Sequence, residues 1–268
     1  MATRAYTSLL DRVTLHAQHC PTPVIEQALS RAAIRACERT LLWRHAEPLR
    51  TLDPGVHVYD YAKPADSDVH AVFGAYLNDY PLDRITLEQA LERYPAWADL
   101  YSGEAFASLW SSAGGSLVGM PEFDEAPFDG PSGYTTSEAS TTDGATPRAV
   151  CQITPDKFVV LPLPDDEQTY RLRMFYALRP TRTATGLPEV VFDELEDAIY
   201  HSALHEIMTT PGSTWVGADV SDSRAASMRA EKARYHAQQF AVEVAQRRAR
   251  ANLGNARGSM SVQMRPFA

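Results

Sequence analysis

Apolar residues recur at helical spacing near both ends of the chain and at alternate positions in its middle. The first helical run carries Tyr6, Leu9, Leu10 and Val13. After the prolines at 21 and 23, a second run carries Ile25, Ala28, Leu29, Ala32 and Ala36. The spacing predicts two helices joined by a short turn, with the second running through Thr40, Leu41 and Trp43 until Pro48 stops it.

The period then changes to two. Val56 and Val58 alternate with polar or aromatic neighbours, and a second alternating run carries Val69, Ala71, Phe73, Ala75 and Leu77. These runs predict a pair of strands. Thr86 and Gln89 then have the spacing of a capping box, which predicts a short helix running toward Tyr94 before Pro95.

The clearest strand signal lies at residues 158–178. Residues 158–163 predict a strand, residues 164–167 a turn, and the next run a returning strand, so the expected structure is a β-hairpin. The buried face of the returning strand is expected to consist of Tyr170, Leu172, Met174, Tyr176 and Leu178. Its other face carries Arg171, Arg173 and Phe175, which predicts a half-exposed strand.

Helical spacing returns beyond Pro188, in a run that contains Val191, Phe192, Leu195, Ala198, Ile199, Ala203 and Ile207 and ends near Pro211. A last helix is predicted from about Asp222 to Arg250. One side of it carries Ala226, Ala230, Ala233, Ala237, Phe240, Ala241 and Val244. Small residues allow helices to approach closely, so this helix is expected to lie against the earlier ones.

The predicted fold class is α+β: a helix bundle built from the N- and C-terminal helices, with a central β-rich insertion and an extended C-terminal arm. The expected parts are bundle helices at 1–50 and 189–250, the insertion at 51–188, and the arm at 251–268. Within the insertion, residues 111–147 are rich in Gly, Ser, Thr and Pro and predict a long loop or a partly extended arm. Segments of this kind contact a partner or are mobile, so this one is a candidate contact element.

Charge is distributed unevenly along the chain. The formal net charge is -9, yet residues 221–268 contain nine Arg or Lys against three acids, which makes that segment +6 and the rest -15. A basic end on an acidic body is typical of proteins that bind nucleic acid or dock onto an acidic protein partner. A solvated helix face is the plainer interpretation.

Candidate chemistry is sparse. His201 and His205 have a spacing that can share a metal, but no third ligand is evident, and a packed or surface pair is favoured. The grouping of His16, His19 and Cys20 indicates a helix end, and the acids at 165–167 indicate a solvated turn. The sequence contains no GxSxG, GxxxxGK[ST] or GxGxxG motif, so no enzyme activity, cofactor or metal is expected.

Compartment signals are equally plain. Three widely spaced cysteines, Cys20, Cys37 and Cys151, predict free thiols rather than disulfides. The sequence has no apolar run long enough to span a membrane, and residues 1–13 lack the apolar stretch of a signal peptide. The protein is therefore expected to be made and used without secretion and to have no membrane partner.

Four stretches resemble the head-to-tail adaptor proteins of short-tailed bacteriophages, also called head completion or tail tubular proteins. They are RAAIRACERTLLWRHAEP, FVVLPLPDDEQTYRLRMFYALRPTRTATGLPE, DELEDAIYHSALHEIM and RRARANLGNARGSMSVQMRPFA. Their order and spacing fit over most of the chain, and the poorest match is residues 100–147. Each stretch is loosely patterned, so the resemblance rests on their combination.

The resemblance implies a virion protein that is made in the host cytoplasm and lies at the head-tail junction. Copies of it would form a ring, typically twelve-fold, bound beneath the portal protein. In such a ring the helical part forms the wall, the β-rich part faces tail nozzle or fibre proteins, and genomic DNA passes through the channel without specific binding. The C-terminal extension would dock on the portal. The expected portal-binding residues are Arg247, Arg248, Arg250, Asn252, Asn255, Arg257, Val262, Met264, Arg265 and Phe267.

Two other classes of function stay open at this point. The basic segment could bind nucleic acid, in which case binding would depend on salt and on Arg247, Arg248 and Arg250. The His201 and His205 pair is the only feature that favours an enzyme.

Overall fold

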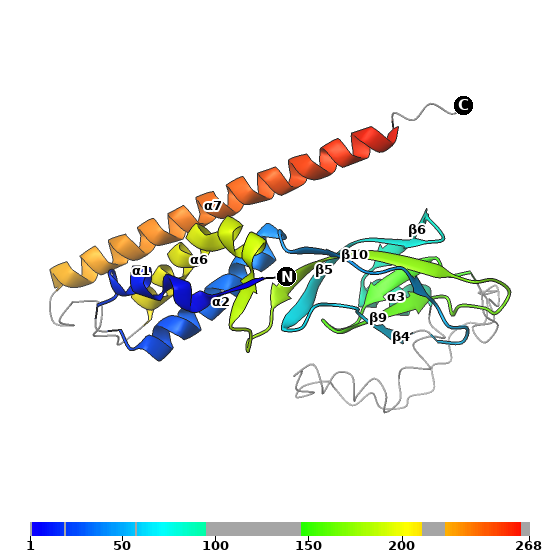
Figure 1. The fold of residues 1–268 in the computed structure, drawn as a ribbon, viewed down its shortest axis with the longest axis horizontal. Coiled ribbons are helices and arrows are strands. Elements are labelled where there is room, and N and C mark those ends of the chain that lie inside the picture. The colour runs from blue at the N-terminus through cyan, green and yellow to red at the C-terminus, as the bar shows by residue number, and fades with distance from the viewer. Residues whose placement is uncertain (1, 19, 57, 95–145, 211–222, 264–268) are drawn as a thin grey trace, which may run out of the picture. The chain divides into compact units, whose positions relative to one another are not determined.

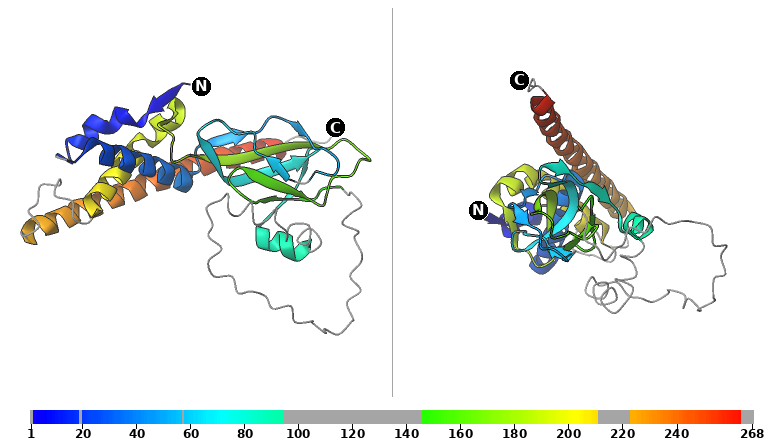
Figure 2. Two further views of the ribbon diagram at one scale, coloured as in Figure 1. Left: turned by 90° about the horizontal axis from the view of Figure 1, so that it is seen from below. Right: turned by 90° about the vertical axis from the view of Figure 1, so that its right-hand side faces the viewer.

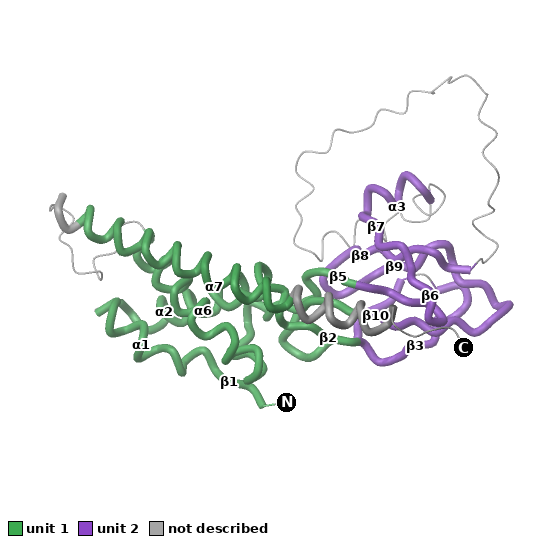
Figure 3. The backbone as a smooth tube through the Cα atoms, turned by 90° about the horizontal axis from the view of Figure 1, so that it is seen from above, with its two compact units in different colours: residues 1–46, 63–73, 175–268 green, residues 47–62, 74–174 purple. Residues whose placement is uncertain are grey.

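The computed structural model describes residues 2–18, 20–56, 58–94, 146–210 and 223–263 (Figure 1). The chain is a mixed α+β protein, as the sequence predicts at that level. It divides into two compact units (Figure 3). Unit 1 comprises Met1–Ala46, Lys63–Phe73 and Phe175–Ala268, and unit 2 comprises Glu47–Ala62 and Gly74–Met174. The predicted loop at 111–147 lies, apart from its last two residues, outside the described residues.

Unit 1 begins with a short strand. Strand β1 (Thr3–Ala5) pairs antiparallel with β11 (Gly186–Pro188), and the chain continues into a 3-10 turn (Tyr6–Leu9) and helix α1 (Leu10–Thr14). The first predicted helix is thus present, although its first turn is 3-10. Three residues are too few to show an alternating pattern, which is why the sequence did not reveal β1.

Helix α2 (Thr22–Thr40) buries the predicted apolar side and ends earlier than predicted. Its C-cap, Leu41, has a φ of 55°, a left-handed conformation that breaks the helical path. The expected continuation through Trp43 to Pro48 is therefore wrong, and strand β2 (Arg44–Ala46) follows instead. Trp43 lies beyond the end of the helix but is buried, so its apolar side chain fitted the helical pattern by coincidence.

Helices α6 (Glu189–Thr209) and α7 (Ser223–Gln263) run antiparallel, since Glu194 pairs with Arg247 while Met208 contacts Arg229. Helix α6 also packs against α2, where Arg31 and Arg35 both pair with Glu206. Figures 1 and 2 show α7 lying alongside α6 in unit 1. Helix α6 has the predicted extent and buries the predicted residues other than Val191, which is half-buried.

The end of α7 differs from the prediction. The extended arm was expected from residue 251, but the helix continues to Gln263. Gly254 and Gly258 were interpreted as turn positions, yet an interior glycine costs a helix only about 1 kcal/mol relative to alanine. The first proline after Arg250 is Pro266, so nothing forces an earlier end.

One sheet has the strand order β2-β10-β5-β6, with β3 (Arg50–Thr51) also paired to β10. Its long strands are β5 (Ser67–Leu77) and β10 (Arg171–Pro180), and β6 is Tyr80–Pro81. The burial predicted for the returning strand is confirmed: the five apolar residues expected on its inner face are buried, whereas Arg171, Arg173 and Phe175 are exposed.

The second sheet, in unit 2, has the order β4-β9-β8-β7. Its strands are β4 (Val58–Asp60), β7 (Asp83–Ile85), β8 (Ala149–Gln152) and β9 (Lys157–Leu161). Strands β7 and β8 are parallel, and the other neighbours are antiparallel.

Two predicted strand pairings are wrong. The runs at 158–163 and 170–178 do form β9 and β10, but these belong to different sheets and make no hairpin. Likewise β4 pairs with β9, and not with β5. Strand β9 has four consecutive buried residues and is bonded on both edges, so its sequence signals a strand without indicating which strand lies beside it.

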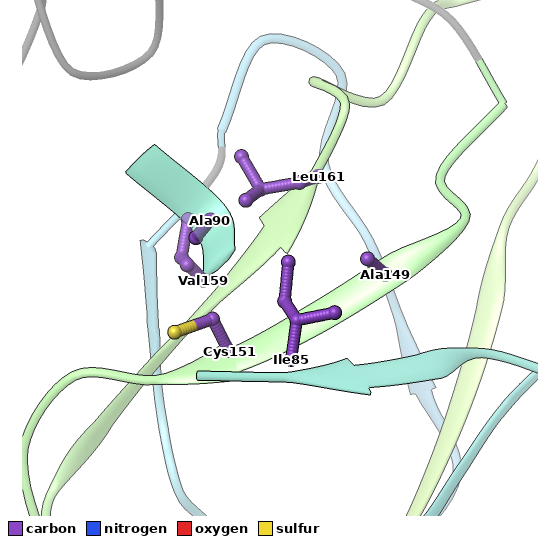
Figure 4. Packing of buried hydrophobic residues seen from close by; sticks show 6 residues of the cluster. All are labelled: Ile85, Ala90, Ala149, Cys151, Val159 and Leu161. Carbon is purple, nitrogen blue, oxygen red and sulfur yellow. The ribbon is translucent and has the colours of Figure 1, made fainter. Parts of the chain in front are cut away.

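Helix α3 (Leu87–Arg93) covers the second sheet through Ala90 (Figure 4). The buried cluster comprises Ile85, Ala90, Ala149, Cys151, Val159 and Leu161. The predicted capping box is confirmed: the Thr86 hydroxyl accepts from the Gln89 N–H, and the Gln89 side chain accepts from the Thr86 N–H. This local sequence pattern predicted the start of the helix correctly.

The β1–β11 contact yields a prediction. A Cβ atom added at Gly186 would lie 2.4 Å from the Arg4 carbonyl oxygen, so the backbones approach too closely for any side chain. We expect Gly186→Ala to lower the free energy of unfolding by about 1–3 kcal/mol, as overpacking does elsewhere. The exposed neighbour Thr185→Ala is the control, with an expected change within about 0.5 kcal/mol in urea unfolding. Equal effects of the two substitutions would contradict this account.

Candidate protein-interaction surface

Helix α7 carries most of the charge predicted to be functional, and a narrow line of buried residues holds it in unit 1. Ala233, His236 and Phe240 are buried, at the three- and four-residue spacing of one helix face. Arg39 of α2 lies 5.3 Å from the centre of the Phe240 ring, within cation–π range. The buried line only partly matches the predicted stripe, because Ala226, Ala230 and Ala241 are exposed.

Two arginines tie α7 to α6 at separated points. The Arg229 guanidinium donates to the carbonyl oxygens of Met208 and Thr210, at 2.8 and 2.7 Å, which satisfies acceptors at the C-terminal end of α6. About five turns further along, Arg247 pairs with Glu194 at 2.7 Å and with Glu243 at 3.5 Å. These contacts fix the register of the two antiparallel helices.

Between those points lies a cluster of histidines. The Nδ1 atoms of His201 and His236 are 2.9 Å apart, and His205 Nδ1 lies 3.0 Å from the Ala233 carbonyl oxygen. The His16 ring lies 6.5 Å from that of His236. A contact between two ring nitrogens requires one to donate and the other to accept, so the His201–His236 contact excludes the doubly protonated pair.

Burial favours the neutral form of two of these histidines, His201 and His236. Burial, followed by the nearby His201, His16, His205 and Lys232, lowers the pKa of His236 from 6.5 to about 4. Burial also lowers the pKa of His201, which Asp197 partly opposes. A neutral imidazole pair at the α6–α7 contact is therefore the state at neutral pH.

The metal and catalytic candidates gain no further ligands. In the ranges that the structure describes, no group of three or more His, Cys, Asp or Glu side chains could hold a metal. His201 and His205 instead bond to α7, and His19 lies outside the described residues. Asp165, in the acidic turn, accepts from the Tyr170 hydroxyl at 2.8 Å. The three cysteines are buried free thiols, as expected from their spacing.

The predicted portal-binding residues fall mostly on one helix. Arg247, Arg248, Arg250, Asn252, Asn255, Arg257 and Val262 belong to α7, whereas Met264, Arg265 and Phe267 lie outside the described residues. Arg247 is half-buried in its ion pairs, and Arg248 and Arg250 are exposed. The basic residues are thus presented by a helix and not by an extended strand as far as Gln263.

Sequence reasoning missed a second feature of α7. Met228, Tyr235 and Val242 are about half exposed, and they are spaced seven residues apart. The exposed side of the helix therefore has an apolar line of its own. The heptad spacing was visible in the sequence, but the alanine-rich stripe gave a competing pattern.

Comparison with known protein families identifies the family of the chain. The family model described as SU10 adaptor protein matches residues 4–265, nearly the whole chain. No curated protein matches. Among the described helices, none combines the length and the apolar composition that crossing a bilayer requires.

The neutral histidine pair predicts a dependence of stability on pH. Between pH 6.5 and about 4 the unfolded chain binds a proton at residue 236 that the folded chain does not bind, so the free energy of unfolding should fall as pH drops through that window. His236→Gln should reduce this fall, measured by urea unfolding at several pH values. His70→Gln, at an exposed position of β5, is the control and should leave the profile unchanged. An identical profile for His236→Gln and the wild type would refute the assignment.

Proposed function

Because the chain belongs to the SU10 adaptor protein family, a family of bacteriophage adaptors, we propose that it is the head-to-tail adaptor of a virion. In this proposal, copies of the chain form a ring beneath the portal protein, extend the channel for DNA and attach the tail. The role is structural and involves no catalysis or cofactor.

The observation that carries the proposal is the family match over residues 4–265. It includes all four stretches on which the resemblance rests, apart from the last three residues of the fourth. The composition of unit 1 supports it, since this unit joins Met1–Ala46 to Phe175–Ala268. A helical body assembled from both ends of the chain is what the resemblance implies for a ring wall.

We propose the following division of the chain. The helices of 1–50 and 189–250 form a bundle that builds the ring wall, and the insertion at 51–188 faces the tail nozzle or fibre proteins. Residues 251–268 reach the portal. Contacts of α6 with α1, α2 and α7 support a single bundle.

The portal-facing element in this proposal is the C-terminal part of α7 with the residues that follow it. Arg248 and Arg250 are exposed there and available to acidic partners, whereas Arg247 is engaged by Glu194 and Glu243. A guanidinium can bind a carboxylate through two hydrogen bonds, which favours Arg as an anchor for a protein interface.

The charge distribution supports passage of DNA without binding. Residues 1–220 carry a net charge of -15. Phosphates near carboxylates gain no favourable interaction, so an acidic channel wall would let DNA slide. The alternative class, a nucleic-acid-binding protein, would use the cations of α7 instead.

Portal binding gives the direct test. Purified protein should decorate its cognate portal assembly as rings visible by electron microscopy, and a chain lacking residues 253–268 should not. Replacing Arg248 and Arg250 together by Gln should weaken attachment at least tenfold in a sedimentation assay, because two charge-assisted contacts are lost.

A matched control removes two positive charges elsewhere. Arg171→Gln with Arg173→Gln changes two exposed side chains of β10 and should leave portal attachment unchanged. The adaptor proposal fails if the full chain does not bind the portal but shifts DNA, and if that shift weakens with salt and with loss of Arg248 and Arg250. The cations of α7 would then bind nucleic acid.

A further inference from the structure

The exposed side of α7 has the composition of a contact surface. Met228, Tyr235 and Val242 have 52, 53 and 47% of their surface exposed, although all three are large apolar or aromatic side chains. Seven residues fall about 20° short of two full helical turns, so the three lie along one line of the helix. We call this line the outer stripe of α7.

Positively charged residues of α7 lie near the outer stripe. Lys232 and Arg250 lie about 60° around the helix from the stripe, whereas Arg234 and Arg248 lie about 100° and 140° away from it. All four are exposed, and among the described residues none of them makes an ion pair. The exposed acid Glu231 flanks the stripe on its other side. The partner that covers the stripe should therefore offer an apolar side chain among carboxylates.

The first half of α6 offers that combination. Val190 is 78% exposed, and five acids follow or precede it closely: Glu189, Asp193, Glu194, Glu196 and Asp197. Within the subunit, only Arg4, Arg12 and Arg247 pair with these acids in the described residues, which leaves more carboxylates than guanidinium groups. We call Glu189, Val190 and Asp193 the acidic edge of α6.

We infer that the outer stripe of α7 docks on the acidic edge of α6 in a second copy of this chain. The two surfaces are made of different residues, as a head-to-tail contact that closes a ring requires. Lys232 beside the stripe would face the carboxylates of the edge. They lie on different helices, so one copy can use both at once. The inference rests on the proposed function for its ring, but the contact itself is testable without the portal.

Cross-linking tests the contact directly. A full chain carrying Val242→Cys and Val190→Cys is treated with a short bismaleimide, both alone at high concentration and after mixing with portal assemblies. The native thiols at positions 20, 37 and 151 are buried and give little background. We expect a ladder of cross-linked species extending to ring size. The control chain, with His70→Cys replacing Val242→Cys, should give no ladder, since residue 70 is exposed on β5 and is not part of the stripe.

A second variant measures the strength of the contact. Tyr235→Asp places a carboxylate in the stripe, opposite carboxylates, and should reduce the double-cysteine ladder at least tenfold. Glu92→Asp, on α3 of unit 2, should not reduce it. Circular dichroism checks that each variant keeps its helices. Urea unfolding checks that Tyr235→Asp keeps the α6–α7 contact, because the Tyr235 ring also lies 6.3 Å from the His201 ring and 5.2 Å from the His236 ring.

The outcomes separate the inference from the proposed function. A ladder in either arm that Tyr235→Asp suppresses supports the contact, even if the portal is not decorated and the adaptor proposal falls. Decorated portals without a ladder overturn the contact and leave the adaptor proposal standing. Loss of portal decoration by Tyr235→Asp, with no ladder from the double-cysteine chain, overturns the contact and assigns the stripe to the portal.

Discussion

The packing of α6 is the constraint on which unit 1 depends. Its buried side chains lie on more than one side of the helix, from Phe192 and Leu195 to Tyr200 and Leu204. Helices α1, α2 and α7 all contact it. An α-helix that is apolar around most of its circumference has to be enclosed, so α6 can exist in this form only with its neighbours in place. The two ends of the chain are joined through this one helix.

The contacts around α6 differ in kind. Toward α2 they combine closely packed alanines, such as Ala32 and Ala36, with the ion pairs of Glu206. Toward α7 they rely on the His201–His236 contact and two arginines. Of the α7 residues with described side chains, only Ala233, His236 and Phe240 are buried. Polar contacts specify the register of α7, while its burial contributes less than that of α2.

Local signals in the sequence predicted the elements well. The periodicity of α6, the capping box of α3 and the alternation of β10 each depend on residues within a few positions of one another. The pairing of β9 with β4 and β8 depends on residues distant in the chain, and a strand buried on both faces fits many partners. The same distinction applies to the candidate surface. The cations of α7 were evident from the sequence, but the burial of His236 was not, because histidine is common both in protein interiors and on protein surfaces. The extent of α7 was underestimated because two glycines were given the weight of a stop signal.

Few of the described α7 side chains are buried within the subunit, and this has a consequence for assembly. Two interior glycines each cost α7 about 1 kcal/mol relative to alanine, so tertiary contacts add to its stability. Its buried line within the subunit covers one side near Ala233 to Phe240, while the outer stripe remains exposed. Covering that stripe would add apolar burial to a helix whose internal contacts are largely polar, so association and ordering of α7 should reinforce each other. An adaptor built in this way would gain its full rigidity as the ring closes, and the same helix would then present its basic C-terminal part from a fixed support.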